Sequence, residues 1–545
     1  MGQVKSNLVR TFSWFVVTRL LASVSKPFQH ALASFFLYFS LTLAAGLNQP
    51  IELSSGKIAG IEIESGVNAF LGIPFAAPPT RDLRWKPPEP PAPWRGVRLA
   101  DRKGPDCLQS RGPSLMSEDC LYLNVWSNAE SSDAKLPVMV WIHGGGWAMK
   151  ATYDGDAFAK HGVVLVAVNY RMGAFGWMAH PALSNESSNG VSGNYGILDH
   201  LAALEWVQEN IGHFGGDKDN VTVFGESAGA GSVYALLATP RSEGLFHKAI
   251  AQSTWINTTN VSNLKTHNGF MQSAEERGVE AIASKLEQKE LLDRNTLDAM
   301  RSLSSADVLE LEHQVSLIVD GWLFERAPID TFKAAKQRKV PIMSGYNDGE
   351  GLLYSRRNMP ASVAEQRERR LSQLGNLGDT VAELYVAKSE ADVRDAEIDY
   401  TSDDMFVRAS REIAQAAFKA DQDSYLYVFG RNLNRPEERA PHYAEVKYVF
   451  NKLKPEASTE DHELAANMIG YWTAFAGTGS PNISGLPQWP KYDLKNQAYQ
   501  LLDTPISRGS KDRKVRLDAM DSYVQSRYAA KRPLGVSWPI ENLRE

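Results

Sequence analysis

The sequence predicts one large α/β domain, in which helices cover a mostly parallel central sheet. Short apolar runs recur along the chain without polar alternation, a pattern typical of strands that are buried on both faces. A helical pattern at residues 196–211 lies between the second run and the third. This alternation favours parallel pairing, although the earliest strands can be antiparallel. The runs are at residues 138–142, 163–168, 221–224, 248–252, 340–343 and 425–429.

The helical segments have two different patterns. Apolar residues of the 196–211 segment recur every three or four positions, as expected for a helix that packs on a sheet. Residues 271–313 and 360–420 are instead rich in Glu, Lys, Arg, Ala and Leu, and they predict amphipathic helices inserted between sheet strands. No internal repeat or low-complexity linker interrupts residues 50–545. A length of 545 residues corresponds on average to three or four domains. Because no linker divides the chain, we expect instead one domain that is enlarged by insertions.

Composition excludes several classes of protein. Hydrophobic residues make up 43%, charged residues 22% and aromatic residues 10% of the chain, which is ordinary for a globular protein. A disordered, collagenous or polytopic membrane protein is therefore not expected. The net charge of −6 shows no basic excess, so nucleic acid is not an expected partner.

The start of the chain predicts an export signal. Residues 1–26 carry basic residues and no acid, and the apolar stretch 31–47 ends in small residues near Ala45 and Gly46. We expect residues 1–46 to be removed from a domain that spans 47–545, and the protein to be secreted or periplasmic. The alternative is an uncleaved membrane anchor, although stretch 31–47 is short against the roughly 20 residues that a spanning helix needs.

Export would also allow a disulfide between Cys107 and Cys120, which are the only two cysteines in the sequence. Two buried thiols are the alternative.

A candidate nucleophile lies between a predicted strand and a predicted helix. The segment Gly225-Glu226-Ser227-Ala228-Gly229 follows the apolar run 221–224 directly. A serine on such a tight turn projects its hydroxyl above the sheet, and the flanking glycines allow close backbone approach. The pattern predicts that Ser227 is a nucleophile.

A glycine-rich segment after an earlier strand predicts an oxyanion hole. Residues 144–146 are all glycine and follow the run 138–142. We expect the N–H groups of Gly145, Gly146 and Ala228 to bind the oxyanion. A phosphate-binding loop is the weaker reading, because no Gly-Lys-Ser or Gly-Lys-Thr follows.

Chain order narrows the choice of acid and base. In architectures with a nucleophile of this kind the acid follows the serine and the histidine follows the acid. Asp348 and Glu350 lie in a loop directly after the run 340–343, and either could orient an imidazole. Of the histidines beyond them, His462 is in the first turn of a predicted helix, whereas His442 is in a loop after the run 425–429. His442 is therefore the predicted base.

Taken together, these motifs resemble the type-B carboxylesterase family, which includes cholinesterases and bacterial para-nitrobenzyl esterases. The resemblance covers about residues 50–540 and includes the loops around Glu350 and His442. Two departures are Gly349, where the family usually has an acid, and Tyr443, where it more often has glycine. The other matching stretches are residues 72–79, 117–126, 143–146, 169–176, 215–217 and 225–229.

The resemblance implies an α/β-hydrolase fold, with a large central mostly parallel twisted sheet flanked by helices and with helical insertions. It also implies that Glu350 is the triad acid, with Asp348 as the second candidate. The expected activity is hydrolysis of small to medium carboxylic esters through an acyl-enzyme, without metal or organic cofactor. The resemblance assigns Arg84 with Glu118, and Arg171 with Asp199, to structural ion pairs.

Three points about the substrate and partners follow. A thioesterase or an amidase would use the same triad, and a non-catalytic esterase-like binding protein is the alternative outside the enzymes. Choline is not an expected ligand, because no aromatic residue lies between Cys107 and Cys120 and because Leu353 stands where cholinesterases have an aromatic residue. The expected partner is a small-molecule ester, and the oligomeric state stays open.

Overall fold

The computed structural model describes residues 47, 49–110, 112, 115–149, 153–255, 261–269, 271–286, 296–355, 359–375 and 378–529. The predicted export signal at residues 1–46 therefore lies outside the described residues. Among the residues that are described, no helix is long and apolar enough to span a bilayer.

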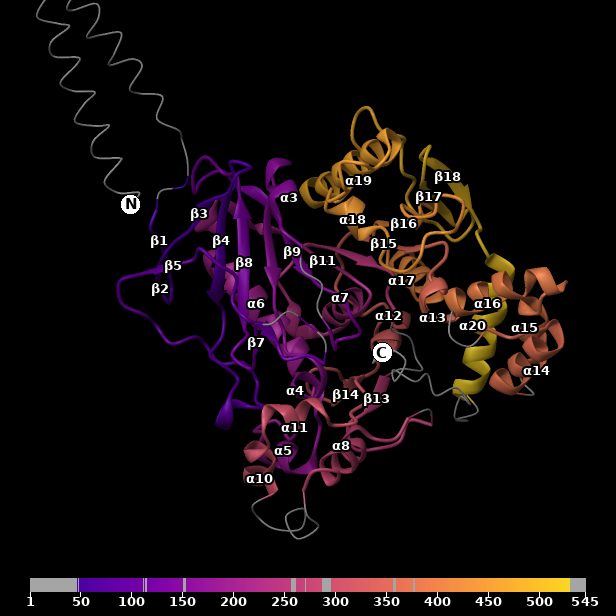
Figure 1. The fold of residues 1–545 in the computed structure, drawn as a ribbon, viewed down its shortest axis with the longest axis horizontal. Coiled ribbons are helices and arrows are strands. Elements are labelled where there is room, and N and C mark those ends of the chain that lie inside the picture. The colour runs from indigo at the N-terminus through magenta and orange to yellow at the C-terminus, as the bar shows by residue number, and fades with distance from the viewer. Residues whose placement is uncertain are drawn as a thin grey trace, which may run out of the picture. The chain divides into compact units, whose positions relative to one another are not determined.

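The centre of the described part of the chain is an eleven-stranded mixed sheet (Figure 1). Strands β10, β9, β11, β12, β15, β16 and β17 are neighbours in this order, and each pair is parallel. Strands β8, β4 and β3 at one edge, and β18 at the other, pair antiparallel. The predicted α/β class is confirmed, and so is the antiparallel pairing of the earliest strands. The strands are β3 (Ile61–Glu62), β4 (Asn68–Pro74), β8 (Tyr122–Ser127), β9 (Leu136–Ile142), β10 (Val164–Val168), β11 (Gly216–Glu226), β12 (Lys248–Gln252), β15 (Ile342–Asn347), β16 (Ser424–Phe429), β17 (Ala498–Leu502) and β18 (Ser507–Ser510).

Each predicted apolar run overlaps a sheet strand, but β10 begins one residue after its run, at Val164, and β15 differs from its prediction at both ends. It begins at Ile342, since Pro341 has no N–H to give to the sheet. It then continues through four residues that are mostly small or polar, to Asn347. These residues carry no apolar signal, yet all of them are buried by neighbouring strands and helices.

Both faces of the sheet are buried. On one face, aromatic rings of the sheet pack against rings of the segments above it. The ring centroids of Trp141 in β9 and Phe450 are 4.9 Å apart, and those of Phe224 in β11 and Phe158 are 5.5 Å apart. Alternate side chains such as Val140 are also fully buried, and α6, α7 and α17 pack against the sheet. This double burial explains why the strands are uniformly apolar.

The predicted insertions are helical. Residues 271–313 contain α8, α10 and α11, and residues 360–420 contain α14 to α17. Figure 1 shows α14, α15 and α16 together with the C-terminal helix α20 at one edge of the fold, where they share a small apolar core. The longer helices are α6 (Tyr195–Asn210), α7 (Ala228–Ala238), α8 (Ala274–Ala283), α14 (Val363–Leu374), α16 (Val393–Ser402), α17 (Arg408–Lys419), α19 (Thr459–Thr478) and α20 (Lys514–Ala529). The shorter helices are α3 (Asp156–Lys160), α4 (Gly173–Trp177), α5 (Pro181–Glu186), α10 (Thr296–Ser302), α11 (Ser305–Leu309), α12 (Pro328–Lys333), α13 (Leu352–Ser355), α15 (Asp379–Tyr385) and α18 (Val446–Val449).

Among the described residues, three small sheets lie outside the central one. They pair β1 with β2 and β2 with β5, β6 with β7, and β13 with β14. A π-helical segment, Asp403–Val407, joins α16 to α17. The strands of the small sheets are β1 (Ile51–Leu53), β2 (Gly56–Ala59), β5 (Val97–Leu99), β6 (Asp106–Cys107), β7 (Met116–Ser117), β13 (Val261–Asn263) and β14 (Leu317–Val319).

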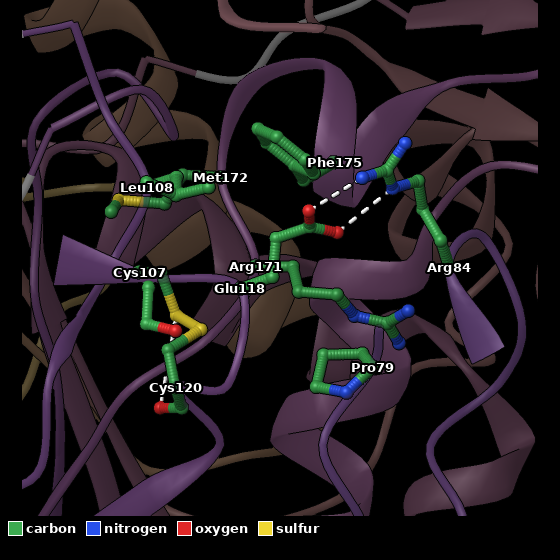
Figure 2. Close-up of a pocket in the computed structure, with 10 residues that line it drawn as sticks. Pro79, Arg84, Cys107, Leu108, Glu118, Cys120, Arg171, Met172 and Phe175 are labelled. Atoms are coloured by element: carbon green, nitrogen blue, oxygen red, sulfur yellow. Dashed lines mark hydrogen bonds and ion pairs between the residues drawn. A yellow bond between two sulfur atoms is a disulfide. The ribbon is translucent and has the colours of Figure 1, made fainter. Parts of the chain in front are cut away.

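The two cysteines form a disulfide in the structure (Figure 2). Beside it, Arg84 and Glu118 form a bidentate pair, with Nε to Oε2 at 2.8 Å and Nη2 to Oε1 at 2.5 Å. Arg84 Nη1 also donates to the Leu303 carbonyl at 2.7 Å, so the pair anchors the first insertion to the sheet domain.

The second expected ion pair is more deeply buried. Arg171 donates from Nη2 to Asp199 Oδ1 at 2.7 Å, and its backbone N–H donates to Asp199 Oδ2 at 2.9 Å. Both side chains are almost fully buried. Every charged oxygen of this carboxylate therefore has a donor, which is the condition under which a buried pair is tolerated.

Candidate active site

Ser227 lies on a strained turn between β11 and α7. Its φ is 56° and its ψ is −119°, a conformation that non-glycine residues rarely adopt. The turn leaves no room for a side chain at the flanking Gly229, because a Cβ there would lie 2.0 Å from the Ile142 carbonyl oxygen. The Ser227 N–H donates to the Gln252 carbonyl at 2.8 Å. The strand, turn and helix expected around the serine are therefore all present.

The predicted histidine and one predicted acid are in contact. Glu350 follows β15 and His442 follows β16, so parallel neighbours bring both to the carboxyl edge of the sheet, where β11 also delivers Ser227. His442 Nδ1 is 2.5 Å from Glu350 Oε2, and Glu350 Oε1 accepts the Asn347 N–H at 2.8 Å. The carboxylate thus holds one ring nitrogen and leaves Nε2 on the opposite side of the imidazole.

The two alternative residues lie elsewhere. The Asp348 carboxylate does not contact the imidazole but accepts the backbone N–H of Ala440 at 2.6 Å. His462 is in the first turn of α19, as its sequence context predicts. Of the two acids that the sequence left open, the one that reaches His442 is therefore Glu350.

The residue after the histidine has an unusual backbone conformation. Tyr443 has a φ of 73°, in the left-handed region that favours glycine. This conformation explains why glycine suits that position in the family that the sequence resembles. The Tyr443 ring lies near Tyr153, at a centroid separation of 6.1 Å.

Three fully buried carboxylates surround the imidazole, although only Glu350 was predicted to act on it. The Glu226 carboxylate is the ionic neighbour of Nε2, with Oε1 at 3.2 Å. Glu445 accepts hydrogen bonds from Asn347 Nδ2 at 2.7 Å and from Gln252 Nε2 at 3.2 Å. Glu445 was not among the predicted site residues, and its one signal in the sequence was its place three residues after His442.

These carboxylates alter the protonation of the site. Burial raises the pKa of Glu226 well above its usual range and also raises the pKa of Glu445. For His442, burial by itself lowers the pKa, but the charges of Glu226, Glu350 and Glu445 and the hydrogen bond to Glu350 outweigh it. The pKa of His442 is raised to about 9. The imidazole is therefore a stronger base than an ordinary histidine side chain.

The glycine segment adjoins the serine. A Cβ on Gly144 would lie 3.1 Å from Ser227 Cβ, so the two turns are in contact. The Gly145 carbonyl accepts from the N–H groups of the two residues that begin the next turn, and this folds the segment back on itself. In the described part of the chain, the N–H groups of Gly145 and Gly146 have no backbone acceptor. Ala228 is the first residue of α7, where N–H groups lack an intrahelical acceptor. All three predicted donors can therefore serve an oxyanion.

Aromatic rings form the walls around the histidine. The Phe406 ring lies 4.4 Å from the His442 ring, and Tyr354 lies 5.7 Å from it. Near the glycine segment, Trp147 stacks on Trp177 at 4.2 Å. Phe406 belongs to the π-helical segment within an insertion, and no pattern in the sequence indicated that it would reach the site.

Among the described residues, no group of three or more His, Cys, Asp or Glu side chains is arranged to hold a metal ion.

Comparison with known proteins decides the family. A family model for the carboxylesterase family matches residues 48–520. The chain belongs to the carboxylesterase family. It is 37% identical over 466 residues to fumonisin B1 esterase of Sphingopyxis macrogoltabida, covering 81% of this chain and 84% of that protein. It is 34% identical over 502 residues to pyrethroid hydrolase Ces2e of Rattus norvegicus, covering 84% and 86%.

Solved structures agree with this assignment. The carboxylesterase EST55 of Geobacillus stearothermophilus superposes with a TM-score of 0.75 at 32% identity, over 86% of this chain and 99% of that one. A PNB esterase superposes with a TM-score of 0.73 at 30% identity, over the same shares. The present protein therefore has the predicted α/β-hydrolase fold, and it is a carboxylic ester hydrolase.

Proposed function

We propose that this carboxylesterase cleaves small to medium carboxylic esters through a Ser227–His442–Glu350 triad and a covalent acyl-enzyme. The proposal rests on one observation, which is the contact of Glu350 with His442 Nδ1 beside the strained turn of Ser227. A carboxylate on Nδ1 keeps the proton there and leaves Nε2 free to accept another.

The first half of the reaction forms the acyl-enzyme. His442 Nε2 takes the proton of the Ser227 hydroxyl while Oγ attacks the ester carbonyl carbon. The carbonyl oxygen becomes an oxyanion, held by the N–H groups of Gly145, Gly146 and Ala228. When the intermediate collapses, the carbon–oxygen bond to the alcohol breaks, and the leaving alkoxide takes the proton from Nε2.

The second half repeats these steps with water. His442 Nε2 takes a proton from water as the hydroxide attacks the acyl carbon, and the same N–H groups hold the second oxyanion. Collapse breaks the bond to Ser227, whose Oγ regains the proton from Nε2. The products are one alcohol and one carboxylic acid, so the triad returns to its starting state.

A Ser227→Ala variant tests the triad. It is expected to lose ester turnover and labelling by a fluorophosphonate probe, with an unchanged Tm, because the substitution removes only the hydroxyl and adds no atom to the packed turn. A variant that kept most of its kcat would refute the assignment. Labelling of the unaltered protein also separates an enzyme from an esterase-like binding protein, which would not react with the probe.

A thioester is the second candidate substrate. A fatty acyl-CoA hydrolase of Anas platyrhynchos is 33% identical over 551 residues, covering 89% of this chain and 96% of that protein. The same triad can attack a thioester or an amide carbonyl. Turnover of p-nitrophenyl esters of rising chain length, beside an acyl-CoA and an anilide, ranks the three classes by kcat/KM. We expect esters to lead, and a leading thioester or anilide would overturn that order.

We also propose that residues 1–46 are an export signal, so that the mature enzyme is secreted or periplasmic. The basic start, the apolar stretch 31–47 and the small residues near Ala45 support it. Sequencing the N-terminus of the enzyme from its producing cell tests the proposal. A chain that still begins near Met1 would favour the membrane-anchored alternative.

A further inference from the structure

The loop that carries Glu350 and the loop that carries His442 are joined two residues before each of these side chains. Gly349 N–H donates to the Ala440 carbonyl at 2.9 Å, and the Ala440 N–H donates back to Asp348 Oδ1 at 2.6 Å. The Asp348 carboxylate thus takes the position of a backbone carbonyl and closes a two-bond ring between the loops.

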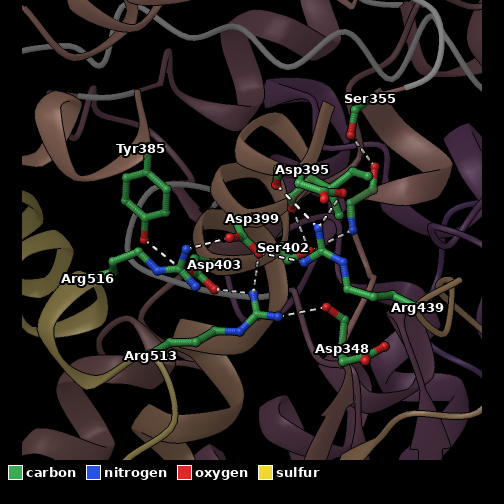
Figure 3. A network of polar contacts seen from close by, with 12 residues as sticks. Asp348, Ser355, Tyr385, Asp395, Asp399, Ser402, Asp403, Arg439, Arg513 and Arg516 are labelled. Atoms are coloured by element: carbon green, nitrogen blue, oxygen red, sulfur yellow. Dashed lines mark hydrogen bonds and ion pairs between the residues drawn. The ribbon is translucent and has the colours of Figure 1, made fainter. Parts of the chain in front are cut away.

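Arg513 holds the same residue from the other side. Its Nη2 donates to the Asp348 carbonyl at 2.7 Å, and its Nη1 donates to Asp403 Oδ1 at 2.8 Å. Figure 3 shows Arg513 between these two aspartates. Asp403 begins the π-helical segment that places Phe406 against the ring of His442. One buried guanidinium therefore links the acid loop to the wall of the site.

The histidine loop has a matching anchor. Arg439, directly before Ala440, donates from Nη1 to Asp399 Oδ1 at 2.6 Å. The other oxygen of Asp399 accepts from Arg516 Nη1 at 2.5 Å. Because Arg513 and Arg516 bracket the start of α20, both catalytic loops are tied to the last helix of the fold (Figure 3).

We propose that Asp348 is a positioning residue for ester hydrolysis: its carboxylate, backed by Arg513, sets the placement of His442 relative to Glu350. The proposal rests on the triad described above. Its physical basis is that the two loops are joined through Asp348 and Ala440, which lie only two residues before Glu350 and His442. A displacement of about 1 Å in a catalytic group can cost roughly a hundredfold in rate.

The charge of Asp348 changes near neutrality. Burial raises its pKa to about 7, although the hydrogen bond from Ala440 and the charges of Arg513 and Arg439 oppose that rise. Asp503 also faces this group, and its negative charge raises the pKa further. Above about pH 7 the carboxylate is charged and its bond to Ala440 is strong. Below it, protonation weakens that bond, since hydrogen bonds to charged acceptors are about twice as strong as neutral ones.

The pH dependence of kcat tests the proposal. In the unaltered enzyme, log kcat should fall with a slope of one against pH as the pH is lowered and His442 becomes protonated. Below about pH 7 the slope should be steeper, because Asp348 is then protonated as well. In Asp348→Asn the steeper segment should disappear. The same variant should lose about tenfold or more in kcat at pH 8, with KM within about twofold, because substrate contacts are unchanged.

Glu437→Gln is the matched control. Glu437 is exposed in the same loop as Arg439, and its substitution removes the same charge without touching either catalytic loop contact. It should leave kcat, KM and the pH profile unchanged.

Two results would overturn the proposal. One is an Asp348→Asn variant with unaltered kcat and pH profile while Ser227→Ala is inactive, which would leave the triad in place. The other is a slope of one throughout in the unaltered enzyme, a measurement that does not depend on whether the variant folds. If Ser227→Ala stayed active, the proposed function itself would fail.

Discussion

Two buried charge clusters of this carboxylesterase, one of arginine and aspartate and one of histidine and glutamates, differ in their balance of acidic and basic groups. Around Arg171 each cationic group faces a carboxylate, and Asp199 receives donors on both oxygens. Around His442 three carboxylates face a single imidazole. The first cluster is neutral and saturated with hydrogen bonds. The second sets three fully buried acidic groups around one imidazole.

This difference separates a structural role from a chemical one. A saturated pair has nothing left to bind, so its effect is limited to stability. A cluster with more acidic than basic groups stabilises the imidazolium, which in the proposed reaction forms when His442 takes the serine proton, while the N–H donors hold the oxyanion. The three acidic groups also explain why the pKa of His442 is raised and not lowered by burial. The predictions below test this contrast.

Glu350→Gln should cause the largest effect, because it removes the carboxylate that holds Nδ1. A glutamine amide can donate to Nδ1 and so stabilise the wrong tautomer, and kcat should fall by roughly 10⁴-fold. Tm should change little by comparison. Steady-state kinetics and a thermal melt measure both quantities, with Glu130→Gln on the surface as the control. A loss of less than tenfold would show that another carboxylate orients the ring.

Arg171→Met should affect stability and leave the chemistry intact. It leaves the Asp199 carboxylate buried without its cation, at a cost of about 3–5 kcal/mol in the free energy of unfolding. Denaturant titration measures the loss, and active-site labelling gives kcat per folded molecule, which should be unchanged. The double variant with Asp199→Leu should recover much of the loss. If Arg171→Met lowered kcat per labelled site severalfold, the two clusters would not be separate in role.

Glu226→Gln should shift the acid side of the pH profile. The charge of Glu226 helps to raise the pKa of His442, so its removal should move the acid limb of kcat/KM to lower pH. The expected shift is about one pH unit or less, because Glu350 and Glu445 remain. The limb should stay in place in Glu209→Gln, which lies on the surface. A limb that moved to higher pH would contradict the charge argument.

The smallest expected effect is on how the free energy of unfolding depends on pH. The folded pKa of His442 is about 9, above the ordinary value of 6.5, so its contribution to stability is fully present below pH 6.5 and is lost as pH rises to 9. The difference in unfolding free energy between the unaltered enzyme and His442→Gln should therefore shrink over this interval. Urea titrations at several pH values measure it, and a difference that grew with pH would reverse the sign.

Local patterns predicted the parts of this enzyme that depend on neighbours in the chain. The turn at Ser227 needs small residues on both sides and a strand before it, and each of these is visible as a run of letters. Asp348 and Glu350 could not be separated in this way, because both are acids in one loop and the choice depends on which reaches a histidine about ninety residues later. Glu445 was missed because its side-chain hydrogen bonds come from two other segments, at Gln252 and at Asn347.

The sequence alone therefore determined the α/β class, the nucleophile turn and the two loops from which acid and base come, since hydrophobic period and turn chemistry are local. The tertiary structure decided which carboxylate meets His442, how many others surround it, and that the start of α20 holds both loops through Arg513 and Arg516. These facts depend on the distances between strand ends and inserted helices. Such distances are set by packing among segments that are 92 to 193 residues apart in these contacts, and no short stretch of sequence encodes them.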